Sequence, residues 1–165
     1  MRSTIGIIGF SRSGKTTLAV ALVRHFAARG ERVAYVKHTH HAVGALGDEG
    51  DTHLARLAGA SVVVAADEVV SVEWNAGGQM SAPEPYDDPA ILVGSIDADL
   101  VVVEGWKDLR LWPVILVERA GIERLRPAPA IVAVVSDTES ELPVPRFAPD
   151  DLAGIARFVD RIASV

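Results

Sequence analysis

The sequence predicts an α/β protein in which helices cover both faces of a mostly parallel β-sheet. Short apolar runs rich in Val and Ile recur along the chain without polar alternation, and helical segments separate several of them. Strands that lack alternation are buried on both faces, as in a parallel sheet between helices. We expect a single domain, residues 1–165, because this is an ordinary length for one hydrophobic core.

The expected elements follow in order along the chain. Apolar runs predict strands at residues 5–8, 33–36, 62–65, 100–103, 114–117 and 131–135. We expect helices at residues 16–28, 51–58 and 152–162. Gly30 supplies a stop for the first helix and Asp51 a cap for the second. In the last helix, apolar residues at helical spacing indicate that it packs on the sheet.

The stretch from residue 69 to residue 89 is less regular. Residues 69–74 alternate apolar and polar side chains, which is typical of a strand exposed on one face. Gly77 and Gly78 then indicate a turn. We predict an additional β excursion around residues 69–80, followed by a loop, and expect its edge strand to pair across a dimer.

Composition narrows the class of protein. The chain carries 16 Lys and Arg residues against 22 Asp and Glu residues, a net charge of −6, so nucleic acid is not an expected partner. It has no run near the roughly 18 apolar residues of a membrane span, and the apolar run at residues 5–8 is too short for an export signal. The absence of cysteine is compatible with a reducing compartment. We expect a cytoplasmic protein that does not bind membranes.

A phosphate-binding loop lies between the first strand and the first helix, in the run Gly9-Phe10-Ser11-Arg12-Ser13-Gly14-Lys15-Thr16. The glycines let backbone N–H groups curl around phosphate oxygens at the positive end of a helix. We expect Lys15 to meet the β- and γ-phosphates and the Thr16 hydroxyl to bind Mg²⁺. Ser11, Arg12, Ser13 and Thr17 complete the expected nucleotide-binding set, with solvent exposure as the alternative for Arg12. The sheet is therefore expected to be of the P-loop NTPase type.

Two acidic residues flank the expected strand at 100–103. Asp99 precedes the strand and Glu104 follows it. Ligands of α/β sheets bind at the carboxyl ends of the strands, so we assign Glu104 to magnesium and to catalysis. An ordinary solvated acid at the end of a strand is the alternative.

A histidine-rich segment, Lys37-His38-Thr39-His40-His41, follows the strand at 33–36 and also faces the ligand edge. Three interpretations remain open. The segment binds zinc, with Asp48 or His53 joining it, or it is a surface loop, or it lines a polar pocket for an anionic second substrate, with Lys37 as counter-charge. We favour the pocket over a structural zinc site and include Lys37 and His38 among the nucleotide-proximal residues.

With these motifs in place, the sequence resembles the molybdopterin-guanine dinucleotide biosynthesis protein B (MobB) family. The matching pieces are the phosphate loop, the histidine-rich segment, Gly50-Asp51-Thr52 with Arg56 and residues 58–60, and the run from Asp99 to Lys107. Family members commonly carry a lysine before the residue that corresponds to Asp51, and this chain does not. Trp106 stands where the family usually has Phe.

The resemblance implies GTP and Mg²⁺ as cofactors, a homodimer, and weak GTP hydrolysis secondary to an adaptor role. The partner it implies is the guanylyltransferase that converts molybdopterin to molybdopterin guanine dinucleotide, with molybdopterin itself as a further candidate ligand. Asp51 joins Glu104 as a candidate catalytic residue. A P-loop small-molecule kinase that transfers the γ-phosphoryl group of ATP or GTP is the alternative function.

Two further side chains are candidates for ligand contact. Lys107 lies in the loop after the strand at 100–103, where its charge would meet a phosphate of the nucleotide or of a pterin. Asp137 ends the late strand, where a carboxylate would contact the base, although the familiar Asn-Lys-x-Asp guanine motif is absent. Surface placement of Lys107 and a turn-capping role for Asp137 remain the alternatives.

Overall fold

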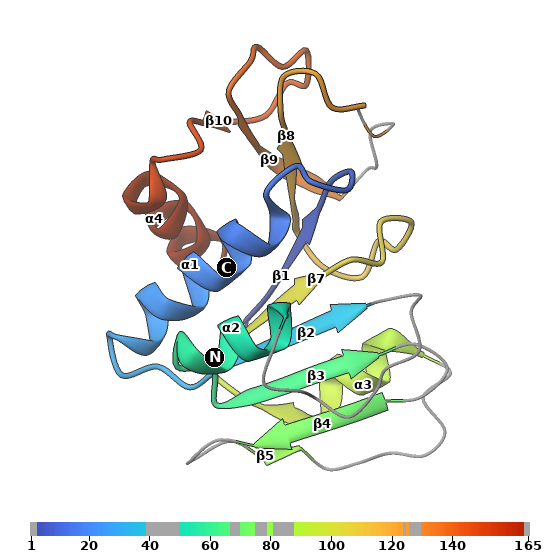
Figure 1. Ribbon diagram of the computed structural model, residues 1–165, viewed down its shortest axis with the longest axis vertical. Helices are drawn as coiled ribbons and strands as arrows, with labels where there is room; N and C mark the ends of the chain where they lie inside the picture. The colour runs from blue at the N-terminus through green and yellow to red at the C-terminus, as the bar shows by residue number, and fades with distance from the viewer. Residues whose placement is uncertain are drawn as a thin grey trace.

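The computed structural model describes residues 3–38, 50–66, 70–74, 79–80, 88–123, 125 and 130–163. Within these residues, eight strands form one sheet in the order β10-β9-β8-β1-β7-β2-β3-β4 (Figure 1). All neighbouring strands in this sheet are parallel except the antiparallel pair β3 and β4. The strands are β1 Ser3–Ile8, β2 Val33–His38, β3 Val62–Ala66, β4 Val70–Trp74, β7 Leu100–Glu104, β8 Val114–Glu118, β9 Ile131–Ser136 and β10 Arg146–Phe147. The predicted α/β class and all six predicted strands are confirmed.

Helices lie on both faces of the sheet (Figure 1), and the sheet separates two hydrophobic cores. The first face carries the three predicted helices, α1 (Lys15–Ala27), α2 (Asp51–Leu57) and α4 (Leu152–Ala163), whose apolar side chains contribute to one core. The second face carries α3 (Pro89–Ser95) and forms the other core. Alternate residues of each strand enter opposite cores: in β2, Tyr35 belongs to the first and Val36 to the second. The absence of polar alternation in the sequence follows from this double burial.

The predicted β excursion is also present. Strand β4 turns back antiparallel to β3 and forms one edge of the sheet, with Val64 opposite Val72. A separate two-stranded sheet joins β5 (Gln79–Met80) to β6 (Ile96–Asp97). Between them lies α3, which the sequence analysis did not assign. Its signal was present, because the Asp88 side chain caps the N–H of Ala90 and Pro89 occupies the first turn.

The three parallel strands β1, β7 and β2 end at the same edge of the sheet, beside the N-terminus of α1. Ile7 lies opposite Glu104, and Glu104 lies opposite Lys37. This register brings the last residues of β7 and β2 next to the loop that leaves β1. Among the described residues, no helix combines the length and apolar character that crossing a membrane requires.

Candidate functional site

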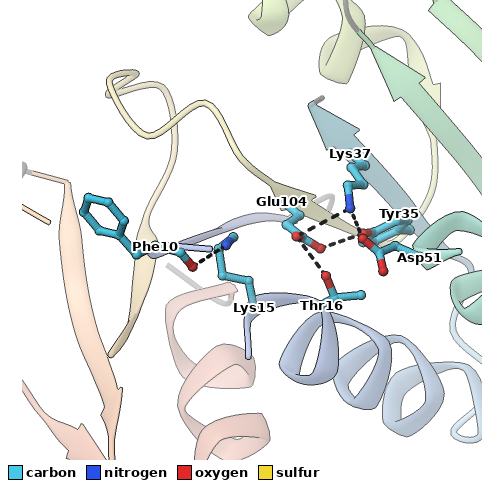
Figure 2. A network of polar contacts seen from close by, with 7 residues as sticks. All are labelled: Phe10, Lys15, Thr16, Tyr35, Lys37, Asp51 and Glu104. Carbon is cyan, nitrogen blue, oxygen red and sulfur yellow. Dashed lines mark hydrogen bonds and ion pairs between the residues drawn. The ribbon is translucent and has the colours of Figure 1, made fainter. Parts of the chain in front are cut away.

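The phosphate loop connects β1 to α1, and Phe10 and Lys15 lie at its two ends (Figure 2). A Cβ atom on Gly9 would lie 2.4 Å from the carbonyl oxygen of Val117 and 2.5 Å from Ser13 Oγ, so only glycine fits. Ser13 is buried, and its hydroxyl makes no hydrogen bond with a described residue. Ser11, Arg12 and Thr17 are exposed, and Arg12 adopts the left-handed conformation, with φ of 64°. The loop thus has a buried inner side and an exposed outer side.

Lys15 is the first residue of α1, and its side chain folds back over the loop. Its Nζ atom donates a hydrogen bond to the carbonyl oxygen of Phe10 at 2.7 Å (Figure 2). Burial lowers the pKa of Lys15, while the charge of Glu104 acts in the opposite direction and that of Lys37 adds to the lowering. A partly desolvated cation at a helix N-terminus is ready to meet an anionic ligand.

Glu104 is the centre of the polar network at this edge (Figure 2). Its side chain is buried, and Thr16 Oγ1 donates to Glu104 Oε1 at 3.0 Å. The Tyr35 hydroxyl donates to Glu104 Oε2 at 2.6 Å from the neighbouring strand. Burial raises the pKa of the Tyr35 hydroxyl well above its usual value, and the negative charge of Glu104 raises it further. Tyr35 therefore stays protonated and remains a hydrogen-bond donor to the carboxylate.

Lys37 joins Asp51 to this network. Its Nζ atom forms an ion pair with Asp51 Oδ2 and lies 3.9 Å from Glu104 Oε1. Asp51 occupies the first turn of α2, where its negative charge also interacts favourably with the positive end of the helix dipole. Lys37 is thus placed between two carboxylates, one from β7 and one from α2. The two predicted catalytic residues, Glu104 and Asp51, lie on either side of the same lysine.

Asp99 lies at the opposite end of β7, and its partner is Arg32. It accepts the backbone N–H of Arg32 at 2.8 Å and the Arg32 guanidinium at 3.2 Å. The backbone hydrogen bond from Arg32, followed by the side-chain one, lowers the pKa of Asp99. The strand direction inferred from sequence is therefore confirmed, with Glu104 at the phosphate-loop edge and Asp99 away from it.

The first two residues of the histidine-rich segment, Lys37 and His38, end β2 and point to opposite faces of the sheet. Lys37 points to the face that carries α1 and α2, because it contacts Asp51 and Glu104. His38, the next residue, stacks on Trp106, with ring centroids 4.8 Å apart and an angle of 21° between the rings. The two residues therefore serve opposite sides of the sheet edge. Thr39, His40, His41 and Asp48 lie outside the described residues. Residue His53 is in α2, where its Nδ1 lies 2.6 Å from the Arg56 guanidinium.

A pocket of about 430 Å³ lies beside the phosphate loop on the His38 side. We call it the stacked-ring pocket. Its lining includes the side chains or backbone of Gly9, Lys15, His38, Trp106, Lys107 and Leu109. Lys107 is exposed and lines this pocket, and its contact with a phosphate stays a prediction.

The remaining predicted residue, Asp137, follows β9. Asp137 is exposed, and its Oδ1 accepts the backbone N–H of Ala120 at 2.8 Å, which ties the loop after β8 to the loop after β9. Neighbouring Arg119 was not predicted: its guanidinium would lie 3.1 Å from a Cβ on Gly14. Glu118, also missed, is buried at the end of β8, and its Oε2 atom has no hydrogen-bond partner among the described residues. The signal for both was their position after a buried strand at the ligand edge.

The oxygen donors at this edge suit a magnesium ion. Mg²⁺ prefers oxygen ligands, takes few from protein, and leaves the rest to phosphates and water. The Thr16 hydroxyl and Glu104 carboxylate supply two such oxygens 3.0 Å apart beside the phosphate loop. The residues present therefore fit a magnesium–triphosphate ligand.

Comparisons with known proteins agree on one family. The model of the family described as molybdopterin guanine dinucleotide synthesis protein B matches residues 4–137. The molybdopterin-guanine dinucleotide biosynthesis adapter protein of Haemophilus influenzae is 33% identical over 140 residues, covering 85% of this chain and 75% of the relative. The protein of the same name from Escherichia coli is 30% identical over 161 residues, covering 94% and 90%.

Solved structures give the same picture of the fold. The crystal structure of molybdopterin-guanine biosynthesis protein B superposes with a TM-score of 0.54 at 25% identity, over 98% of this chain and 99% of that one. The crystal structure of a MobB homologue from Bacillus stearothermophilus gives 0.52 at 23% identity, over 98% and 95%. The likeness thus extends over nearly the whole of each chain.

Proposed function

The chain belongs to the family of molybdopterin guanine dinucleotide synthesis protein B, and from this premise we propose that it is a magnesium-dependent GTP-binding adapter. Its partner is the guanylyltransferase that converts molybdopterin to molybdopterin guanine dinucleotide. GTP hydrolysis is weak and secondary to the adapter role. The whole proposal concerns one nucleotide site at the carboxyl edge of the sheet.

The observation that supports the nucleotide site best is the 3.0 Å contact between Thr16 Oγ1 and Glu104 Oε1. A hydroxyl at the start of α1 and a carboxylate at the end of β7 meet beside Lys15, whose charge suits phosphates. Residues 88 positions apart in sequence are brought together at the place where a bound Mg²⁺ would be held. When bound, the ion would neutralise phosphate charge.

The same network supports a weak rather than an efficient hydrolase. Glu104 already accepts hydrogen bonds from Thr16 and Tyr35 and lies close to Lys37. Both of its oxygens are thus already engaged by protein groups, which disfavours a role as general base for water. Its contacts favour positioning of the ion over general-base catalysis.

The adapter role and the homodimer rest on the family and on the position of β4. Among the described residues this strand forms an edge of the sheet, and the backbone groups of an edge strand can pair with another chain. We propose that two copies pair through this edge. Sedimentation at micromolar concentration would reveal the dimer, and a monomer under those conditions would remove this part of the proposal.

The decisive experiment compares GTP, ATP and GDP binding by calorimetry, each with and without Mg²⁺. We expect GTP to bind more tightly than ATP and the affinity for the triphosphate to depend on Mg²⁺. Preference for ATP would instead favour the kinase alternative, which the pocket beside Lys15 would suit by admitting a phosphoryl acceptor. Product analysis separates the two, because the adapter releases GDP and phosphate and a kinase yields a phosphorylated small molecule.

A further inference from the structure

The stacked-ring pocket and the magnesium-binding residues lie on opposite sides of the same sheet edge. Lys37 contacts Asp51 and Glu104 on the α1 side. His38 stacks on Trp106, and Trp106 packs on the core of the α3 side. Lys15 lines the pocket and also belongs to the phosphate loop, so the two regions meet there. A second ligand placed in the pocket would therefore lie next to the nucleotide phosphates without occupying the magnesium site.

The pocket wall is built from aromatic rings that the fold holds in place. Trp106 stacks on His38 and makes an edge contact with Trp112, with ring centroids 6.3 Å apart. Trp112 is buried against β1, where a Cβ on Gly6 would lie 2.6 Å from its Nε1 atom. The glycine in the middle of a buried strand thus makes room for the tryptophan that supports the stack.

Trp106 also has a backbone conformation that bulky residues avoid. Its φ is +46°, in the left-handed region. Strain of this kind persists only where surrounding contacts impose it, and it gathers at binding sites. Here the Trp106 ring is kept between His38 and Trp112 and in the lining of the pocket.

The charges at the pocket favour an anion. Lys15 and Lys107 both line it, against the single carboxylate of Asp108. Lys15 would contact the nucleotide phosphates when GTP is bound, so Lys107 is the cation of the pocket that remains for a second anionic group. The pocket has a volume of about 430 Å³ and is lined by aromatic rings beside two lysines. These features suit a planar heterocycle that carries a negative group.

We propose that the stacked-ring pocket binds an anionic heterocycle of the pterin class while magnesium and GTP occupy the phosphate loop. This inference rests on the proposed function, which supplies the pterin, and it assigns that ligand to His38, Trp106 and Lys107. The aromatic pair takes the ring system and Lys107 takes the anionic group. The adapter then holds the two reactants of the nucleotide transfer side by side.

The test uses pterin-6-carboxylate as the probe and 6-methylpterin as its uncharged counterpart. Calorimetric titrations are run on the protein saturated with Mg²⁺ and a non-hydrolysable GTP analogue, because a pterin resembles guanine and would otherwise enter the base site. We expect saturable binding of the carboxylate and weaker binding of 6-methylpterin. Binding of the analogue itself is measured first, so that a failure of the nucleotide site is seen separately from a failure of the pocket.

Variants then assign the residues. His38→Ala should lower the affinity for the probe about two- to tenfold, because stacking is lost. Lys107→Ala should lower it about two- to fivefold, because an exposed charge is lost. Arg110→Ala is the matched control, because Arg110 is an exposed cation three residues further along that does not line the pocket. Arg110→Ala should leave affinity for the GTP analogue unchanged. Affinity for the analogue is measured on His38→Ala and Lys107→Ala as well, so that a loss at the nucleotide site is distinguished from a loss at the pocket.

Three results would overturn the proposal. One is the absence of saturable probe binding while the GTP analogue binds normally. Another is equal affinity for the charged and uncharged pterins. The third is an equal effect of Lys107→Ala and Arg110→Ala on the affinity for the probe. This comparison remains valid even if His38→Ala does not fold, because Lys107 and Arg110 are both exposed. Normal probe binding in a protein that prefers ATP would leave the pocket in place and refute the proposed function.

Discussion

The Tyr35 hydroxyl donates a hydrogen bond to Glu104 Oε2 at 2.6 Å across the boundary between β2 and β7. Tyr35 is fully buried, so this contact is shielded from water. With Oε2 held by Tyr35, Oε1 faces Thr16, the side from which a magnesium ion would be bound. Tyr35 is therefore a positioning residue for Glu104.

We predict that Tyr35→Phe weakens magnesium-dependent GTP binding without affecting magnesium-independent binding. The substitution keeps the ring but leaves a buried carboxylate oxygen without its donor. Loss of a hydrogen bond to a charged group should cost about 1.5–3 kcal/mol of unfolding free energy. Urea denaturation measures that loss, and titration of Mg²⁺ at fixed GTP measures the change in ion affinity. A stable variant with unchanged magnesium dependence would contradict the positioning role.

A second prediction separates the two acids of β7. Glu104→Gln should lower magnesium-dependent GTP turnover roughly tenfold or more, because the amide has lost the charge that holds the ion. Asp99→Asn should leave turnover unchanged, since Asp99 contacts Arg32 at the far end of the strand. Steady-state phosphate release measures both variants. If Asp99→Asn loses turnover and Glu104→Gln keeps it, the active site lies at the opposite end of β7 and the assignment of Glu104 is wrong.

Asp99 has a separate effect on stability. Its hydrogen bonds from Arg32 lower its pKa in the folded state, so its contribution to stability is present above the unfolded pKa. That contribution is lost as the pH falls through the lowered folded pKa. Asp99→Asn should therefore flatten the acid side of a plot of unfolding midpoint against pH, and leave its alkaline side unchanged.

The edge placement of Glu104 and Asp99 followed from sequence because strand direction and the position of the phosphate loop were enough to decide it. Successive residues of a strand point to opposite faces of the sheet, and this alternation at the end of β2 accounts for the separation of Lys37 from His38. The Tyr35–Glu104 bond had no comparable signal. It joins residues 69 positions apart, and a tyrosine in an apolar strand looks like an ordinary core residue.

Other features depended on three-dimensional packing in the same way. The contact of Trp112 with Gly6 and the stack of His38 on Trp106 require the register between strands to be known. Arg119 lies next to Gly14 because β8 adjoins β1, an order that the sequence does not state. Sequence motifs identified the phosphate loop and its acid, whereas the side chains that hold that acid became visible only in the fold.

A third prediction concerns Lys15, whose charge is disfavoured by burial in the free protein. Lys15→Met should abolish tight triphosphate binding and leave the unfolding temperature at neutral pH unchanged or higher. The folded-state pKa is lowered, so the unfolded chain binds more protons between the two pKa values, and stability rises with pH in that window. The variant should lack that rise. Calorimetry with GTP and thermal unfolding at several pH values measure both effects, and unchanged GTP affinity in a folded variant would refute the phosphate-loop assignment.

The last prediction uses the position of Lys37 between Asp51 and Glu104. Lys37 forms an ion pair with Asp51 and also lies 3.9 Å from Glu104, so it competes with a cation for the Glu104 carboxylate. Removing Asp51 by Asp51→Asn leaves Lys37 with Glu104 as its remaining carboxylate in this network. Magnesium affinity in the GTP complex should then fall, by about three- to tenfold, since the lysine is only partly exposed and its charge is incompletely screened.

Removing the lysine should have the opposite effect. Lys37→Met frees Glu104 from a competing cation, so magnesium should bind more tightly than in the unmodified protein. In the double variant the change caused by Asp51→Asn should disappear, because that change acts through Lys37. Magnesium titrations at fixed GTP on the four proteins form a complete double-mutant cycle. A loss of magnesium affinity in Asp51→Asn that persists without Lys37 would show that Asp51 acts on the ion directly, which would favour the catalytic role predicted for it from sequence.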